Sequence, residues 1–201
     1  MLRETTQLSL KDNNMNIVML GAPGAGKGTH ADFLAQQFGI VHISTGELLR
    51  QQAAQGTELG LRVKGIMERG ELVDDDLVTE IVNDVAAKEH RGLVLDGFPR
   101  TIRQAELLDQ ILHWAGSELA CVLNIDVPEE ELVRRIKERA MIVKRNDEGD
   151  DTIRRRLQEY HSKTLPVKSF YEDQGILVNI DAGGSIEQTR TNIMKAVAEL
   201  G

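Results

Sequence analysis

Residues 16–38 read NIVMLGAPGAGKGTHADFLAQQF: a short aliphatic run, a glycine-rich turn and an amphipathic stretch with helical periodicity. The turn fits the pattern G-x-x-x-x-G-K-[ST], except that Gly28 follows Lys27 and the hydroxyl residue, Thr29, comes one place later. A strand that passes through glycines into a helix presents backbone N–H groups, the positive end of a helix dipole and a lysine to phosphate oxygens. The stretch therefore predicts a nucleotide phosphate site in which Thr29 supplies the metal-facing hydroxyl.

Short aliphatic runs and longer amphipathic runs alternate along the rest of the chain. The aliphatic runs lack a polar face, which is typical of parallel strands covered by helices on both sides. They predict strands at Asn16–Leu20, Val41–Ile43, Gly92–Leu95, Ala120–Ile125 and Leu177–Ile180. The amphipathic runs predict helices at Lys27–Phe38, Thr45–Gln55, Gly60–Glu68, Asp75–Lys88, Ile102–Trp114, Pro128–Ala140, Asp150–Asp173 and Ser185–Leu200. This alternation predicts an α/β fold of the P-loop NTPase type, a doubly wound parallel five-stranded sheet flanked by helices, with ligands at the carboxyl ends of the strands.

Two segments interrupt the alternation. From Ser44 to about Lys88 several helices precede the third strand, and Ser44-x-x-Glu47 matches a capping box that should begin the first of them. The segment MIVKRNDEGDD, at 141–151, separates two long helices and carries mixed charge around a single glycine. Each segment is either a mobile flap over a ligand site or a decorated loop, and the pattern alone does not choose between them.

Composition and charge narrow the class of protein. With 201 residues, 41% apolar content and a net charge of −8, the chain is expected to form one domain that binds neither nucleic acid nor an anionic membrane. No apolar run approaches the roughly 18 residues of a membrane span, and residues 1–14 are expected to be a disordered extension. The single Cys121 excludes an intramolecular disulfide, which fits a reducing compartment such as the cytoplasm, and we expect its thiol to be buried.

Charged residues near the motifs indicate phosphate chemistry. The run LVLDG (93–97) ends in Asp96, a position from which a carboxylate typically faces the metal on a nucleoside triphosphate. Phosphoryl transfer between two nucleotides concentrates negative charge, which the protein must neutralise. The candidates are arginines in motif contexts or four apart on one helix, namely Arg50, Arg100, Arg135, Arg139, Arg145 and Arg156. Such chemistry needs no histidine base, so His30 is expected on a helix surface.

Taken together and in order, five segments resemble the adenylate kinase family: GAPGAGKGT, HISTGELLR, ELV (71–73), LDGFPRTIRQAE and R-x-x-x-R…R-N-D-x₄-T-I-x-x-R. The resemblance runs from about Met15 to the C-terminus. It implies reversible transfer of the γ-phosphoryl group of Mg·ATP to AMP, giving two ADP, by a cytoplasmic monomer. The family's phosphate loop is followed by glycine and then threonine, so Gly28-Thr29 is its expected form.

The resemblance also implies roles for individual residues. ATP would contact Gly24, Ala25, Gly26, Lys27, Gly28, Thr29, Arg135, Arg139 and Gly184. AMP would contact Thr45, Arg50, Glu71, Leu72, Val73, Gly97, Phe98, Pro99, Arg100, Gln104, Arg145 and Arg156. The catalytic set would be Lys27, Arg100, Arg139, Arg145 and Arg156. Asp96, through water, and Thr29 would bind Mg²⁺. No zinc is expected, because the short lid has neither the room nor the cysteines for a zinc site.

The resemblance also divides the chain and leaves alternatives for its substrate. It implies a core of 15–43, 74–139 and 150–201, an AMP-binding insertion at 44–73 and a short lid at 140–149. Related pyrimidine nucleotide kinases have alanine where Thr45 stands and asparagine where Thr101 stands, so both positions favour AMP. Gln104 is able to form paired hydrogen bonds with an adenine edge. The alternatives are a UMP/CMP-type kinase and a non-catalytic adenine-nucleotide sensor.

Overall fold

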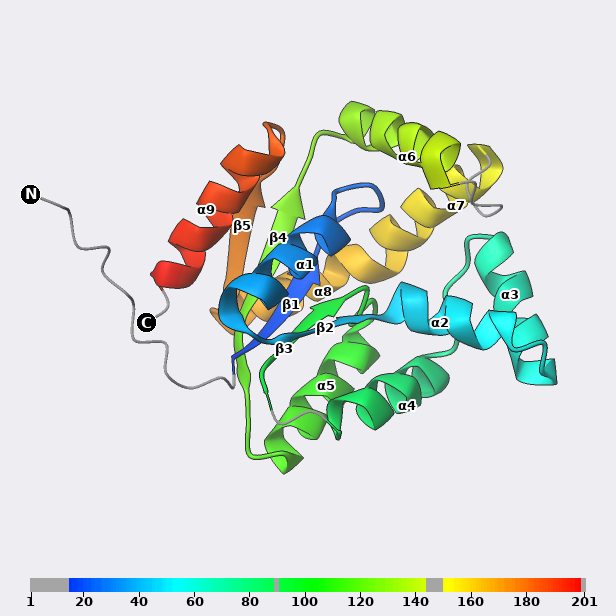
Figure 1. Ribbon diagram of the computed structural model, residues 1–201, viewed down its shortest axis with the longest axis horizontal. Coiled ribbons are helices and arrows are strands. Elements are labelled where there is room, and N and C mark those ends of the chain that lie inside the picture. Colours follow the sequence, from blue (N-terminus) through cyan, green and yellow to red (C-terminus); the bar gives the residue numbers. More distant parts are fainter. Residues whose placement is uncertain (1–14, 89–90, 144–149, 200–201) are drawn as a thin grey trace, which may run out of the picture.

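A five-stranded parallel sheet forms the centre of the molecule (Figure 1). The computed structural model describes residues 15–88, 91–143 and 150–199, with the backbone alone at 139–143 and 150. The strands lie in the order β2-β3-β1-β4-β5. Their bounds are β1 Asn16–Leu20, β2 Val41–Ser44, β3 Leu93–Asp96, β4 Leu119–Asp126 and β5 Leu177–Asp181. The predicted α/β fold is confirmed, with each strand within one residue of its expected ends, whereas the extension predicted at 1–14 lies outside the described residues.

The central strand β1 is buried on both faces because helices cover both. Ile17 and Met19 belong to an apolar cluster that includes α1 (Lys27–Phe38) and α9 (Ile186–Ala198). Val18 and Leu20 belong to a second cluster that includes α5 (Ile102–Trp114) and α8 (Leu165–Asp173). Successive side chains of a strand point to opposite faces, so a run without polar residues is what this doubly covered position requires.

The carboxyl ends of the strands meet at one edge of the sheet. Ser44 at the end of β2 lies beside Asp96 at the end of β3, and Met19 of β1 lies on the other side of Asp96. The loops that follow these strands carry the glycine-rich turn, the segment beginning at Thr45 and the segment Gly97–Arg100. The fold thus brings the three sequence motifs to one place.

The remaining helices complete the described part of the chain. They are α2 Thr45–Ala54, α3 Glu58–Glu68, α4 Asp75–Ala86, α6 Glu129–Val143 and α7 Asp150–Glu159. Helices α2 and α3 project away from the sheet on the same side of the molecule as α7 (Figure 1). The Thr152 hydroxyl donates a 3.1 Å hydrogen bond to the carbonyl of Glu68, which joins the end of α3 to α7. Within the described ranges, no helix has both the length and the apolar character that a membrane span requires.

Three local predictions were wrong. The single helix predicted at Asp150–Asp173 is α7, a π-helical turn at Tyr160–Thr164 and α8, whose first turn contains a proline without an N–H to donate. Ser44 is the N-cap residue immediately before α2, but its side chain makes no capping hydrogen bond. A capping box forms instead at Ser185, which begins α9. Helix α6 runs three residues past its expected end.

The thiol of Cys121 provides a test of core packing. It is buried in β4 as expected, and this burial raises its pKa to about 12. Because the thiolate is the reactive form, we expect a thiol reagent at pH 8 to label the folded protein at least about 100-fold more slowly than the protein unfolded in guanidinium. The measurement is the rate of thionitrobenzoate release. Equal rates would show that β4 opens to solvent under native conditions.

Candidate active site

A cavity of about 860 Å³ lies at the carboxyl edge of the sheet. Most of the residues that the sequence nominated line it: Gly24, Gly26, Lys27, Gly28, Thr29, Thr45, Arg50, Glu71, Leu72, Val73, Asp96, Gly97, Pro99, Arg100, Gln104, Arg135, Arg156 and Gly184. Ala25 and Phe98 are fully buried beneath the wall and do not line it. Arg139 lies on the described backbone of α6, and Arg145 lies outside the described residues.

The glycine-rich loop adopts a conformation that depends on its glycines. Gly24 has φ +87°, and a Cβ there would meet the Ile136 side chain at 2.7 Å and a backbone oxygen of α6 at 2.9 Å. Both the positive φ and the lack of space for a Cβ therefore restrict position 24 to glycine. Lys27 folds back over the loop, where its Nζ donates to the carbonyls of Gly21 at 2.8 Å and Ala22 at 2.9 Å. The ammonium group is thus held inside the loop's own curve.

Gly28 allows an acidic side chain to approach the loop. A Cβ at position 28 would lie 3.2 Å from Oδ2 of Asp96, which projects from the end of β3. A larger side chain there would require the carboxylate to shift by a few tenths of an ångström. The hydroxyl of the motif comes from Thr29, which also lines the cavity. One carboxylate and one hydroxyl beside a phosphate loop suit Mg²⁺, which takes few protein ligands and completes its shell with water and phosphate.

A histidine and a second aspartate adjoin Asp96. His42 of β2 has Nδ1 at 2.7 Å from Oδ1 of Asp32 on α1, and its Nε2 lies 3.9 Å from Oδ2 of Asp96. Both His42 and Asp32 line the cavity. This group was not predicted from the sequence, where the only signal was that His42 is the first residue of the motif HISTGELLR.

Three arginines converge on the cavity beside Asp96. The Nε of Arg100 donates to the carbonyl of Gly97 at 2.8 Å, which directs the guanidinium group back across its own turn. Burial lowers the pKa of Arg100; Asp96 opposes that shift, and the charges of Arg156 and Arg50 add to it. Because the charges of Arg50 and Arg156 lower the pKa of Arg100, the three guanidinium groups lie close together. They come from three different helices or turns. Such a cluster favours a polyanion.

The turn after β3 brings Thr45 and Gln104 to the same wall. Gly97 has φ +81°, and a Cβ there would meet the Thr45 hydroxyl at 2.7 Å and the Arg100 guanidinium at 2.8 Å. The Thr45 hydroxyl donates to the carbonyl of Asp96 at 3.3 Å. Gln104 is 2% exposed, yet it borders the cavity. The apolar part of this wall comes from Leu49, Met67, Leu72, Val73 and Val78.

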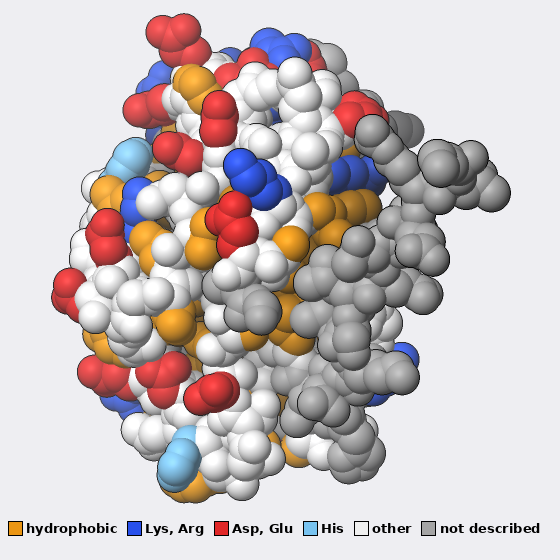
Figure 2. Space-filling model, turned by 90° about the vertical axis from the view of Figure 1, so that its left-hand side faces the viewer, with side chains coloured by type: hydrophobic (Ala, Val, Ile, Leu, Met, Phe, Trp, Pro, Cys, Tyr) orange, Lys and Arg blue, Asp and Glu red, His pale blue; other side chains and the backbone are white. Residues whose placement is uncertain are grey.

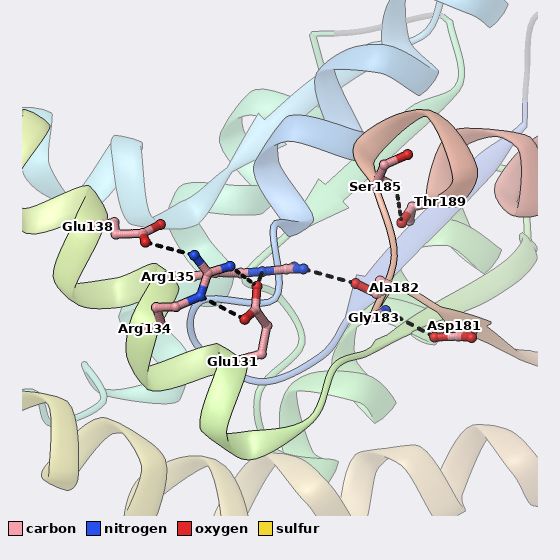
Figure 3. A network of polar contacts seen from close by, with 9 residues as sticks. All are labelled: Glu131, Arg134, Arg135, Glu138, Asp181, Ala182, Gly183, Ser185 and Thr189. Carbon is pink, nitrogen blue, oxygen red and sulfur yellow. Dashed lines mark hydrogen bonds and ion pairs between the residues drawn. The ribbon is translucent and has the colours of Figure 1, made fainter.

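Helix α6 forms a charged wall near the loop after β5 (Figure 3). Arg135 donates through Nε to Glu131 at 2.8 Å and through Nη2 to the carbonyl of Ala182 at 3.1 Å. Hydrogen bonds from Arg134 and Arg135 lower the pKa of Glu131 to about 2. Arg134 also reaches Glu138 at 2.8 Å. This network fixes Arg135 against the loop that leads to Gly184, on the cavity wall.

His30 is not on the helix surface, where it was expected. It is 4% exposed, lines the cavity beneath the glycine-rich loop, and its buried Nδ1 has no hydrogen-bond partner among the described residues. Burial lowers the pKa of His30, and the charges of Arg190 and Arg135 lower it further. The helical periodicity of α1 places position 30 on the buried face with Ala31 and Leu34. We had expected a polar histidine to lie on the exposed face.

We expect His30 to make the protein sensitive to mild acid. Below its ordinary pKa of about 6.5 the unfolded chain binds a proton that the folded chain resists, so the free energy of unfolding falls as the pH is lowered. Above that pH both states are neutral and the effect disappears. Urea unfolding from pH 7.5 to 5 should therefore show a shallower decline for H30Q than for the unmodified protein. Parallel declines would mean that His30 is protonated alike in both states.

Comparison with known proteins identifies the family of the chain. The family model for adenylate kinase matches residues 19–176. An adenylate kinase of Thermus thermophilus is 46% identical over 186 residues, which cover 92% of this chain and 98% of that protein. An adenylate kinase of Thermobifida fusca is 45% identical over 185 residues, covering 91% and 98%, and one of Phocaeicola vulgatus is 42% identical over 188 residues, covering 92% and 100%.

The parallel sheet, its glycine-rich loop and the convergent arginines define a phosphate-binding-loop protein that acts on nucleotides. Among such proteins the class is that of the nucleoside monophosphate kinases. The chain belongs to the adenylate kinase family.

Proposed function

We propose that the cavity holds Mg·ATP and AMP together, and that the protein transfers the γ-phosphoryl group of ATP reversibly to AMP, giving two ADP. The observation that carries this proposal is the convergence of Arg50, Arg100 and Arg156 on a cavity that also contains a lysine-bearing phosphate loop. A single nucleotide does not require that many cations. Two nucleotides placed end to end require them, because their facing phosphates repel one another.

ATP is assigned to the side formed by the loop and α6. The backbone of Gly24–Thr29 and the start of α1 offer N–H donors to the phosphates, and Lys27 exchanges its carbonyl partners for phosphate oxygens. Arg135 and Arg139, one helical turn apart on α6, are assigned to the same nucleotide, and the backbone at Gly184 is assigned to its base. When bound, Mg²⁺ would neutralise charge on the phosphates, and Asp96, through water, and Thr29 would hold it.

AMP is assigned to the side formed by α2, α3 and the turn after β3. Arg50 and Arg100 hold its phosphate, while Thr45, the backbone of Glu71–Val73 and Gln104 surround its base. Phe98 contributes by filling the core beneath the turn, and Pro99 by shaping it. The AMP phosphate is already anionic at neutral pH, so the attack needs alignment and charge neutralisation and no base.

The proposal also includes closure of two segments over the nucleotides. The insertion 44–73 and the short lid 140–149 are assigned as moving parts around a core of 15–43, 74–139 and 150–201. Arg145 and Arg156 then approach the phosphates from the lid side. Excluding water protects the phosphoryl group from hydrolysis and strengthens every charge interaction in the cavity.

The cell compartment and the oligomeric state are also proposed. The single cysteine and the acidic net charge of −8 support a cytoplasmic monomer. On the face that contains α9, acidic side chains lie scattered among basic and polar ones (Figure 2). Size-exclusion chromatography with light scattering tests the monomer directly, with a mass of 22.4 kDa expected.

Phosphorus NMR tests the proposed reaction. Purified protein is incubated with Mg·ATP and AMP, CMP, UMP or no acceptor. ADP is expected to form rapidly with AMP and slowly or not at all with the others. Faster conversion of CMP or UMP would move the protein to the pyrimidine nucleotide kinases. ATP binding without transfer to any acceptor would favour a sensor instead.

A further inference from the structure

Asp75, the first residue of α4, anchors two side chains of the AMP wall. One carboxylate oxygen accepts a hydrogen bond from the Thr101 hydroxyl at 2.8 Å, and the other accepts from Nε2 of Gln104 at 2.8 Å. Asp75 is itself half-buried and does not border the cavity. Any influence of Asp75 on a ligand must therefore pass through the side chains that it holds.

These contacts allow the Gln104 amide only one orientation. Its Oε1 accepts a 2.7 Å hydrogen bond from the backbone N–H of Arg100, while its Nε2 donates to Asp75. A backbone N–H only donates and a carboxylate only accepts. Turning the amide over would place oxygen against carboxylate and NH₂ against N–H, leaving buried polar groups unpaired. The amide is thus locked at both ends.

The fixed amide still has one N–H and one oxygen lone pair to offer to a ligand. Adenine presents a complementary pair on one edge, an amino group that donates beside a ring nitrogen that accepts. A 6-oxo purine presents the reverse pair, an oxygen that accepts beside a ring N–H that donates. We propose that Asp75 is a positioning residue that fixes the Gln104 amide and so makes the acceptor site select 6-amino over 6-oxo purine nucleotides. This inference rests on the proposed function, in which Gln104 faces the base of AMP.

The test is the ratio of kcat/KM for AMP to kcat/KM for inosine 5′-monophosphate, measured for D75N with saturating Mg·ATP. Asparagine keeps the size of the side chain but offers one donor and one acceptor, so the Gln104 amide is no longer fixed at that end and only the backbone N–H of Arg100 opposes its turning. We expect the ratio to fall at least about tenfold, mainly through KM for AMP, with KM for ATP unchanged. An unchanged ratio, with both acceptors slowed alike, would overturn the proposal.

D76N is the matched control, because it makes the same charge change one residue along α4. Asp76 is exposed and bonds Arg103 at 2.6 Å on the surface. The D76N variant should keep the ratio within about twofold of that of the unmodified protein. A second control is T101V, which removes one hydrogen bond to Asp75 and the cap on the backbone N–H of Gln104, yet leaves an acceptor-only group facing the Gln104 amide, so the ratio should persist. A shift in T101V as large as that in D75N would show that a loosened contact between α4 and α5 is the cause.

Two further results show whether Asp75 acts through Gln104 and whether the proposed function itself holds. In a Q104A background, adding D75N should change the ratio no further, because Asp75 acts through Gln104. An undiminished effect of D75N in that background would overturn the proposal. If the unmodified protein transfers no phosphoryl group to AMP, the proposed function itself fails. If it does transfer but D75N keeps the ratio, only the role of Asp75 fails.

Discussion

Replacing Arg100 with alanine is expected to lower kcat/KM for AMP by about 10²-fold or more, which corresponds to about 2.7 kcal/mol of lost transition-state stabilisation. The guanidinium group lies in a cluster with Arg50 and Arg156, where its charge is costly without an anion and strongly stabilising with one. The substitution leaves the backbone N–H of residue 100 free to bond Gln104 as before. The loss should therefore reflect missing charge, and steady-state kinetics in AMP measures it.

Two companion variants make the Arg100 result specific. R103A removes an exposed arginine three residues further on, whose partner is the surface carboxylate of Asp76, and should change kcat/KM by no more than about twofold. R100K keeps the charge but loses the planar fork that matches phosphate, so an intermediate loss is expected. Turnover by R100A at the unmodified rate would contradict the proposed arrangement of the acceptor phosphate.

The parts of the fold that were predicted well depend on local sequence. The glycine-rich loop with its flanking strand and helix is encoded within residues 16–38, and α1 and α5 have their predicted bounds. Arg50, Arg100 and Arg156 were nominated from their motif contexts and Arg135 from its spacing on a helix, whereas Arg134, which also lines the cavity, was not nominated. Parallel strands then bring these motifs together at one edge, as the alternation of strands and helices requires.

The features that were missed depend on contacts between distant segments. Asp75 and Gln104 are 29 residues apart, and nothing in the run DDD at 74–76 distinguishes the aspartate that turns inward. The approach of Asp96 to Gly28 likewise appears only when β3 lies beside β1. The glycine at position 28 leaves room for this close approach.

Replacing Lys27 with methionine is expected to lower kcat by about 10²- to 10³-fold while weakening ATP binding by less than about tenfold. Methionine has a similar length and apolar stem but no charge to follow the phosphoryl group as it moves. The carbonyls of Gly21 and Ala22 lose their donor, which should cost only about 1 kcal/mol of stability because water reaches the cavity. Single-turnover kinetics and ATP titration separate the two effects.

The alternative is that Lys27 serves only to pin the loop, since its Nζ bonds two loop carbonyls in this structure. That reading predicts the opposite pattern: a large loss of ATP affinity and a lowered melting temperature, with kcat preserved at saturating ATP. K195M, which removes an exposed lysine at the end of α9, controls for the loss of one positive charge and should match the unmodified protein in both measurements. K27R should not restore turnover, because the longer, planar guanidinium group does not fit the space that the glycine-rich loop leaves for the Lys27 ammonium group.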